Sequence, residues 1–177
     1  MPERIVITGG PGSGKTSLIN ALGDSGYSFL PEVSREVTET AQRAGIDQLF
    51  LKDPIQFSQA LLEARIEQFH LGQDWKSNYL FYDRGIPDVM AYLDYLGSPY
   101  SPHFKELSQS HRYDRILLLP PWPEIYIQDQ QRYESFDQSQ SIHDHLVKVY
   151  KKLGYQSVEI PRGSVDQRVE FVKDLLL

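Results

Sequence analysis

The sequence predicts an α/β protein in which helices cover both faces of a parallel β-sheet. Five short apolar segments alternate along the chain with segments of helical periodicity, an order that is typical of parallel sheets. The segments are nearly continuous in apolar residues, as strands buried on both faces are. A glycine-rich turn, GGPGSGKT, follows the first segment directly, so a strand, a turn and a helix open the chain.

The expected elements follow in order. Strands take the apolar segments at residues 4–8, 27–30, 79–82, 115–119 and 156–160. Helices are expected at residues 14–22, ended by Gly23, and at residues 34–44, ended by Gly45. A further helix starts at the N-cap Asp53 and carries the apolar stripe Ile55, Leu62, Ile66 and Phe69. Later helices carry the stripes Val89, Leu93 and Leu96 (ended by Gly97) and Ile142, Leu146, Val149 and Leu153 (ended by Gly154), and the last runs from the capping box Ser164–Gln167 along Val165, Val169, Val172 and Leu176. No internal repeat or low-complexity linker interrupts the sequence, so residues 1–177 are expected to form one domain.

Composition excludes several kinds of protein. The 177 residues carry a formal net charge of −6 without a block of Lys or Arg, so nucleic acid is not an expected partner. Cysteine does not occur, which excludes disulfides, thiolate zinc sites and thiol nucleophiles. No run of about 18 apolar residues occurs and a strand begins at residue 4, so we expect no membrane span, no signal peptide and a cytoplasmic location. The oligomeric state stays open.

The glycine-rich turn carries a phosphate-binding motif. Gly9, Gly14, Lys15 and Thr16 satisfy the pattern G-x-x-x-x-G-K-[ST] between an expected strand and an expected helix. Glycines let backbone N–H groups point toward phosphate oxygens, and the helix N-terminus adds partial positive charge. The lysine of this motif reaches the β- and γ-phosphates, and its hydroxyl residue binds magnesium. The motif predicts ATP and Mg²⁺ as cofactors, held by Gly10, Pro11, Gly12, Ser13, Gly14, Lys15, Thr16 and Ser17.

The stretch YLFYDRGIPD, residues 79–88, places two opposite charges at the end of a buried strand. In P-loop proteins an acid at the end of a neighbouring strand faces the magnesium ion. Asp83 follows the apolar run directly, whereas RILLLPP at 115–121 ends in prolines. Asp83 is therefore a candidate to bind magnesium with Thr16 or to accept a proton from an attacking hydroxyl. Arg84 is a candidate to neutralise developing charge.

These motifs resemble the nucleoside and nucleotide kinases among P-loop proteins, and in particular small AAA-like ATPase/kinase proteins similar to the ribosylnicotinamide kinase module of NAD biosynthesis. The resemblance covers nearly the whole chain, through GGPGSGKT, PEVSRE, YDRGIPD, LLLPPW and the closing LGY and VEIP. It implies a three-layer P-loop NTPase fold with strand order 2-3-1-4-5. Asp83-Arg84-Gly85 departs from the Glu-Arg-Ser of deoxynucleoside kinases, which leaves the role of Asp83 open between metal ligand and base.

The resemblance implies roles for further segments. A Glu after the second strand is the general base of deoxynucleoside kinases, which makes Glu32 a second candidate base, with Arg35 close by. Residues 122–136 follow the fourth strand, where kinases of this fold carry a lid; Arg132 is a candidate to close over the γ-phosphate, paired with Asp129. The simpler alternatives are an acid that favours a helix N-terminus and a solvated helix face. The implied adenine site is the loop at 161–164, and the acceptor is expected among residues 32–60 and 83–95.

We therefore expect a phosphotransferase that moves the γ-phosphate of ATP, with magnesium, to a small-molecule acceptor such as a nucleoside, a nucleotide or a related metabolite. Lys15 binds the triphosphate, and Asp83 or Glu32 takes the acceptor proton. Arg84 and Arg132 supply positive charge. The alternatives are an ATPase or nucleotide-dependent switch acting on a macromolecular partner, and a nucleotide-binding module without chemistry. The sequence contains no Asn-Lys-x-Asp guanine motif, although the preference between ATP and GTP stays open.

Overall fold

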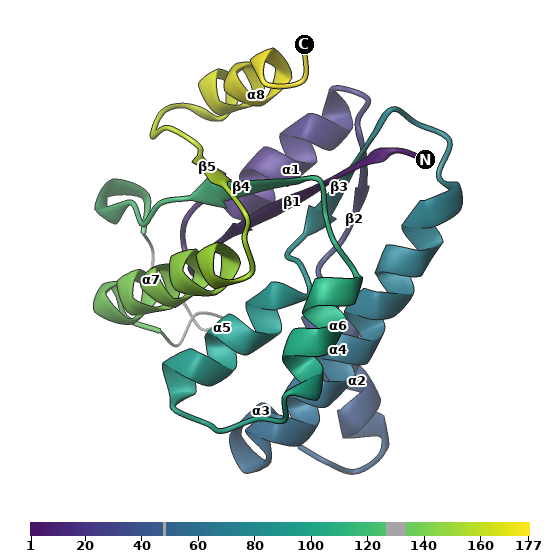
Figure 1. The fold of residues 1–177 in the computed structure, drawn as a ribbon. Coiled ribbons are helices and arrows are strands. Elements are labelled where there is room, and N and C mark those ends of the chain that lie inside the picture. Colours follow the sequence, from purple (N-terminus) through teal and green to yellow (C-terminus); the bar gives the residue numbers. More distant parts are fainter. Residues whose placement is uncertain (48, 127–133) are drawn as a thin grey trace.

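The computed structural model describes residues 1–47, 49–126 and 134–177. Its parallel sheet has the strand order β2-β3-β1-β4-β5, as predicted. The strands are β1 (Glu3–Gly9), β2 (Ser28–Leu30), β3 (Tyr79–Asp83), β4 (Arg115–Leu119) and β5 (Ser157–Glu159). Because β1 lies between β3 and β4, the glycine-rich turn after it opens at the middle of the carboxyl edge of the sheet (Figure 1).

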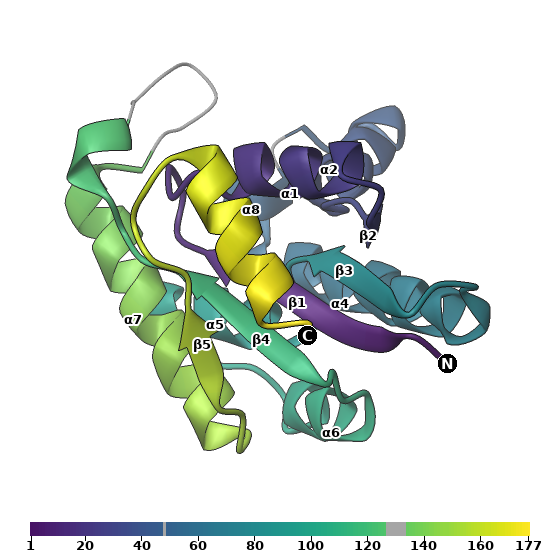
Figure 2. The ribbon, with the colours of Figure 1, turned by 90° about the horizontal axis from the view of Figure 1, so that it is seen from above.

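Helices cover both faces of this sheet, so the three-layer architecture is confirmed. The helical segments are α1 (Lys15–Asp24), α2 (Ser34–Arg43), α3 (Leu49–Lys52), α4 (Pro54–Leu71), η1 (Gly72–Asp74), α5 (Pro87–Leu96), α6 (His103–Ser110), η2 (Pro123–Ile125), α7 (Phe136–Lys152) and α8 (Val165–Asp174). Figures 1 and 2 show α1 and α8 together on one face and α4, α5, α6 and α7 on the other.

Successive residues of the central strands enter two separate cores. Side chains that face α4, α5 and α7 include Val6, Leu80, Tyr82, Ile116 and Leu118. Side chains that face α1 and α8 include Ile5, Ile7, Phe81, Leu117 and Leu119. All ten are at most 3% exposed, which explains why these strands are apolar without alternation in the sequence.

Several helix boundaries differ from the prediction. Gly23 lies inside α1, and the chain turns instead at Gly26, whose φ of 91° strongly favours glycine. Ile55 is 38% exposed and Leu96 54% exposed, so neither belongs to a buried stripe. The buried face of α4 includes Arg65 instead, because a charged side chain with partners can take a position that periodicity reserves for apolar residues.

Helices α3 and α6 were not predicted. Both are short, with 4 and 8 residues, and each presents only one or two buried side chains, which is too few to establish a helical period. The predicted helix starts are confirmed at Asp53, which accepts from the Gln56 N–H at 2.9 Å, and at the Ser164–Gln167 capping box. Helix α7 begins ahead of its apolar stripe at an unpredicted capping box of Ser135 and Gln138.

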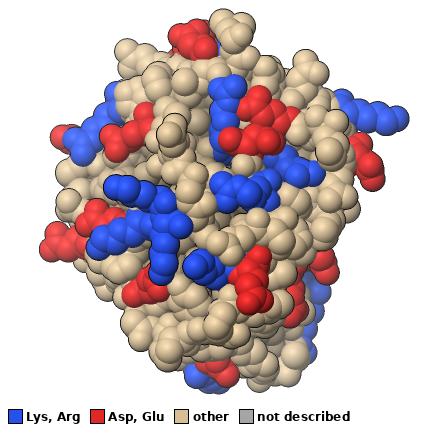
Figure 3. All heavy atoms as spheres, viewed as in Figure 1, with Lys and Arg blue, Asp and Glu red and all other residues tan. Residues whose placement is uncertain are grey.

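The surface mixes charges of both signs. Figure 3 shows acidic and basic side chains interspersed on one face, with a gathering of basic atoms over α7. Lys151 and Lys152 are exposed in the last turn of that helix, where cations interact favourably with the helix dipole. Within the described residues, no helix combines the length and the apolar character that a membrane span requires.

Candidate active site

The glycine-rich turn at residues 9–16, called the phosphate loop below, contains a backbone conformation that only glycine adopts readily. Gly12 has a φ of 74° and Gly14 a φ of 81°, both in the left-handed region. Gly14 is the N-cap of α1, so the first turn of the helix, with its unsatisfied N–H groups, begins directly at Lys15. The loop therefore has the features of an anion site at a helix N-terminus, as the motif predicts.

Three other elements hold this loop in place. The Tyr126 ring packs over Gly12 so closely that a Cβ there would lie 2.5 Å from the ring. Ser139 of α7 donates its hydroxyl hydrogen bond to the Pro11 carbonyl at 2.6 Å. Arg168 of α8 donates to the Ser13 carbonyl at 3.4 Å. Glycine at position 12 is thus favoured by its φ and required by the packing of Tyr126.

Lys15 forms an ion pair with Asp83, and both side chains are 10% exposed. The contact follows from the topology, because β1 and β3 are adjacent and Asp83 is in register with Ile7, two residues before the loop. Burial, together with the nearby Arg84 guanidinium, lowers the pKa of Lys15 below its ordinary value. The structure thus brings the predicted phosphate-binding lysine and the predicted strand-end acid into direct contact.

Arg84 has a strained backbone conformation and is held by several groups. Its φ of 72° makes it the single non-glycine residue with positive φ in the described ranges. Its Nε lies 2.7 Å from Glu32, and its Nη1 donates to the Gly9 carbonyl at 3.2 Å and contacts Asp88 at 3.4 Å. The Tyr92 ring lies 5.4 Å from the guanidinium carbon. Arg84 therefore links the end of β1, the end of β2 and the start of α5.

Glu32 lies between two guanidinium groups. Its Oε1 lies 3.1 Å from Arg65 of α4, and its Oε2 lies 2.7 Å from Arg84. Burial by itself raises the pKa of Glu32, but the charges of Arg65 and Arg84 outweigh burial and lower the pKa to about 2. The expected neighbour Arg35 is exposed on α2, so Arg65 is the cation that sequence reasoning missed.

Arg65 and Asp88 are the site residues that the sequence analysis did not identify. Arg65 is 4% exposed and also donates to the Gly85 carbonyl at 2.9 Å. Its position in α4, three residues after Leu62 and four before Phe69, is on the buried face, and that spacing was an available signal. Asp88 is 0% exposed, although an acid in the first turn of a helix ordinarily signals only a favourable dipole contact.

A small pocket lies beside the phosphate loop at the end of β4. Ser13, Leu119, Pro120, Trp122, Ile160, Pro161, Arg162 and Arg168 line it. The Arg168 guanidinium carbon lies 5.7 Å from the centre of the Trp122 ring. The Ser13 hydroxyl and the Arg168 Nε are buried without a hydrogen-bond partner among the described residues. These orphaned groups and apolar walls adjoin the loop at 161–164, where the adenine site is expected.

The oxygen donors at the phosphate loop fit magnesium. Thr16 is exposed at the start of α1, and the Asp83 carboxylate lies beside Lys15. A hydroxyl and one carboxylate are the few hard oxygen ligands that Mg²⁺ takes when phosphates and water complete its shell. The described part of the chain offers no cluster of three His, Cys, Asp or Glu side chains, so a magnesium ion here would depend on nucleotide phosphates.

Arg132 and Asp129, with residues 127–133 of the expected lid, lie outside the described residues. The two ends of that segment are described. Tyr126 donates to the Glu134 carbonyl, and its ring contacts the Phe136 ring at a centroid distance of 5.7 Å. Since the Tyr126 ring also packs over Gly12, the described residues on either side of 127–133 lie near the phosphate loop. The role of Arg132 stays a prediction.

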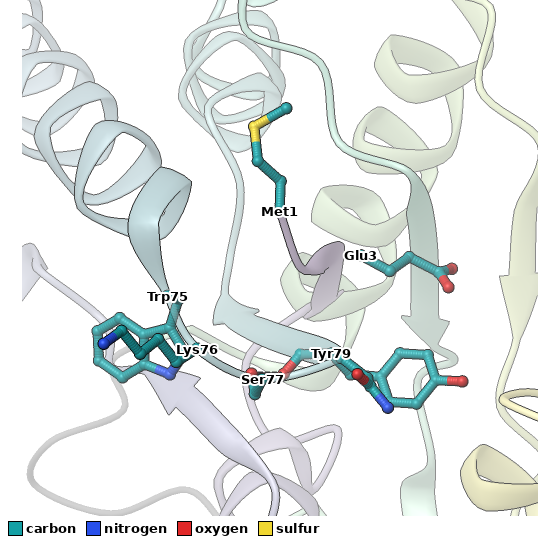
Figure 4. Close-up of a pocket in the computed structure, with 7 residues that line it drawn as sticks. Met1, Glu3, Trp75, Lys76, Ser77 and Tyr79 are labelled. Atoms are coloured by element: carbon teal, nitrogen blue, oxygen red, sulfur yellow. Dashed lines mark hydrogen bonds between the residues drawn. The ribbon is translucent and has the colours of Figure 1, made fainter.

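A second hollow, of about 580 Å³, lies at the opposite edge of the sheet (Figure 4). Met1, Glu3, Trp75, Lys76, Ser77, Asn78 and Tyr79 line it. Glu3 and Tyr79 begin β1 and β3, whereas the phosphate loop follows the carboxyl end of β1. Since ligands of open parallel sheets bind at the carboxyl edge, this hollow is separate from the candidate site.

Comparison with known proteins identifies the family. A sequence family described as an AAA domain matches residues 4–168. The chain belongs to this AAA domain family. A search of the curated proteins gives no match.

Solved structures share the fold of this AAA domain. Deoxyadenosine kinase from M. mycoides, with products dCMP and a flexible dCDP bound, has a TM-score of 0.73 at 14% identity, with 98% of each chain covered. NadR protein in complex with NR has a TM-score of 0.76 at 20% identity, and the match covers 98% of this chain and 50% of that one. The resemblance to P-loop nucleoside kinases is thereby confirmed for the fold.

Gly85 is expected to tolerate no side chain. A Cβ there would lie 2.7 Å from the Tyr150 hydroxyl, 3.0 Å from Val6 Cγ2 and 3.2 Å from Tyr113 Cε2. Gly85→Ser should lower the free energy of unfolding by about 1–3 kcal/mol, measured in urea, because the added side chain would overpack the surrounding core. Tyr150→Phe removes the nearest atom and should recover part of the loss in the double variant. A double variant whose losses simply add would contradict the assigned clash.

Glu32 should make stability fall in acid. The unfolded chain protonates this carboxyl near its ordinary pKa of 4.5, whereas the folded protein does so near 2. The contribution of Glu32 to the free energy of unfolding is therefore fully present above pH 4.5 and is lost as the pH falls toward 2. Between pH 5 and pH 3 this contribution falls by about 2 kcal/mol, and urea unfolding at these two pH values should show that Glu32→Gln lacks this component. Glu39→Gln, which removes an exposed ion pair with Arg43, is the control and should keep it.

Proposed function

We propose that this protein is an ATP- and magnesium-dependent phosphotransferase that moves the γ-phosphate to a hydroxyl group of a small molecule. One observation carries the proposal: the phosphate loop, Asp83 and Glu32 converge at one edge of the sheet, with three cations among them. A phosphoryl group in transit requires this combination of a triphosphate site, positive charge and carboxylates. The kinase fold of the structural relatives supports the same reaction class.

The nucleotide side of the site is the phosphate loop. Lys15 and the loop N–H groups would hold the β- and γ-phosphates, and the pocket beside Trp122 and Arg168 would take the base. Thr16 and Asp83 would hold magnesium, which would neutralise charge on the phosphate oxygens. Lys15 must leave Asp83 to reach a phosphate, so binding exchanges one anionic partner of the lysine for another.

The acceptor side of the site is formed by Glu32 and Arg84. Glu32 forms ion pairs with Arg65 of α4 and with Arg84, and its low pKa keeps it ionised at working pH. Because the transition state of phosphoryl transfer is loose, a weak base is sufficient to take the acceptor proton late in the reaction. We assign this proton to Glu32, and charge stabilisation to Arg84, which reaches both Glu32 and the Gly9 carbonyl.

The charges of this side favour an uncharged acceptor. Arg65 is committed to Glu32 and to the Gly85 carbonyl, and Arg84 is committed to Glu32 and Asp88. A phosphate on the acceptor would have to displace Glu32 from these guanidinium groups, and a partly buried carboxylate would then lose its two cationic partners. A neutral polyhydroxyl compound of the nucleoside class needs no such displacement.

Phosphate transfer from Mg-ATP to a panel of nucleosides, nucleoside monophosphates and sugars tests the proposal. Asp83→Asn should lower turnover at least about 10²-fold while ATP still binds, because the amide keeps the shape of the carboxylate but not its charge. Lys15→Ala should abolish turnover. Asp24→Asn changes an exposed acid at the far end of α1 and is the matched control. Near-normal turnover in Asp83→Asn would refute the role of this residue.

The choice of acceptor can be tested by binding alone. Calorimetry should show that a neutral acceptor binds at least about 10-fold more tightly than its phosphomonoester, because the phosphate meets Glu32. Glu32→Gln should reverse this order, since it frees Arg65 and Arg84 to bind the phosphate. Glu36→Gln, an exposed acid on α2, serves as control. Preference for the phosphomonoester in the unchanged protein would contradict the charge argument.

The name of the family favours one alternative, an ATPase or switch that acts on a macromolecular partner. The two functions differ in the fate of the γ-phosphate. If ATP is consumed, inorganic phosphate is released and no acceptor gains phosphate, the phosphotransferase proposal fails and the ATPase is supported. Transfer of labelled γ-phosphate to one acceptor, lost in Asp83→Asn, supports the kinase.

A further inference from the structure

Asp88 is a fully buried carboxylate to which the proposed chemistry gives no role. It lies in the first turn of α5, four residues after Arg84, and is 0% exposed. A buried carboxylate is costly unless hydrogen bonds and charges compensate it, and removal of its partners is more costly still. The groups that compensate Asp88 therefore indicate what it holds in place.

Four groups donate hydrogen bonds to this carboxylate. Its Oδ1 accepts from the Thr8 hydroxyl at 2.5 Å and from Arg84 at 3.4 Å. Its Oδ2 accepts from the Gly85 N–H at 3.0 Å and from the Tyr150 hydroxyl at 2.5 Å. Thr8 belongs to β1 and Tyr150 to α7, and both side chains are 0% exposed. Asp88 thus joins the central strand and α7 to two consecutive residues of the turn after β3.

Those two residues need support from outside the turn. Arg84 has a φ of 72°, a conformation that is unfavourable for a residue with a Cβ and that persists only where surrounding contacts hold it. Asp88 accepts hydrogen bonds from the Arg84 guanidinium and from the backbone N–H of Gly85, the next residue in the chain. The same carboxylate therefore restrains the backbone and the side chain of Arg84.

We propose that Asp88, held by Thr8 and Tyr150, is a positioning residue that fixes the left-handed turn at Arg84 and places its guanidinium against Glu32 and the phosphate loop. The proposal rests on the proposed function, because it concerns the geometry of a residue that stabilises transferred charge. Asp88 acts through Arg84 rather than on the substrate, so its effect should appear in the rate of transfer and not in nucleotide binding.

The kinetic test compares Asp88→Asn with a matched control. Asp88→Asn should lower kcat about 10- to 100-fold while the KM for ATP changes less than about twofold, because small misplacements of a catalytic group affect the rate that much. Ser108→Ala also removes a buried hydrogen bond, from the Ser108 hydroxyl to the Phe104 carbonyl within α6, and should leave kcat unchanged. A kcat of Asp88→Asn equal to that of the unchanged protein overturns the proposal.

Coupling to Arg84 separates positioning from general destabilisation. In an Arg84→Gln protein, measured by single turnover, adding Asp88→Asn should have little further effect on the rate. An equal effect in both backgrounds overturns the proposal. If Asp88→Asn does not fold, the Thr8→Val/Tyr150→Phe protein, which keeps the carboxylate but removes two of its donors, replaces it. An unchanged kcat in that folded protein also overturns the proposal.

A readout without turnover keeps this proposal separate from the proposed function. In the ligand-free protein, the Arg84 Nε–Hε resonance should shift and exchange faster with water in Asp88→Asn, and stay unchanged in Ser108→Ala. If the unchanged protein phosphorylates no acceptor, the proposed function fails, and this resonance still decides whether Asp88 holds Arg84. A resonance unaltered by Asp88→Asn overturns the positioning role.

Discussion

The need to neutralise buried charge at the carboxyl edge of the sheet organises this protein. Three cations and three carboxylates meet there: Lys15, Arg65 and Arg84 with Glu32, Asp83 and Asp88. Apart from the consecutive residues Asp83 and Arg84, they come from separate segments, and loss of one partner from a buried pair costs about 3–5 kcal/mol. The relative places of β1, β2, β3, α4 and α5 are therefore constrained by electrostatics as well as by the two apolar cores.

This balance has a consequence for ligand binding. In the structure the cations are paired within the protein, so on the proposed function an incoming triphosphate would compete with Asp83 for Lys15. The phosphate would replace the carboxylate as partner of the lysine, and Asp83 would then be free to hold the metal ion that accompanies the nucleotide. The Arg84 guanidinium would keep its position, because it contacts the Gly9 carbonyl, Asp88 and Glu32. If the proposed function holds, the pairing at Arg84 is fixed where charge would develop, and the pairing at Lys15 is exchangeable where the nucleotide would bind.

The sequence predicted those features that depend on local chemistry. The phosphate loop needs glycine at fixed positions, and a strand that ends in Asp83 beside β1 follows from the order of a parallel sheet. It predicted poorly what depends on distant partners. Arg65 lies 33 residues from Glu32, and nothing in either segment reveals that the carboxylate is shared by two guanidinium groups. Asp88 has the sequence position of an ordinary first-turn acid, and only burial shows otherwise.

The departure from the Glu-Arg-Ser of deoxynucleoside kinases also has a physical reading. Gly85 is packed against Tyr150, and the hydroxyl that would collide with a Cβ there is the one that donates to Asp88. A residue without a side chain and a buried Tyr–Asp hydrogen bond are thus two parts of one arrangement behind the turn. The departure at this position concerns how Arg84 is supported, and it leaves Asp83 in contact with the phosphate-loop lysine. The position and charge of the acid decide its chemistry, whereas the residue after the arginine reflects the packing that holds the arginine in place.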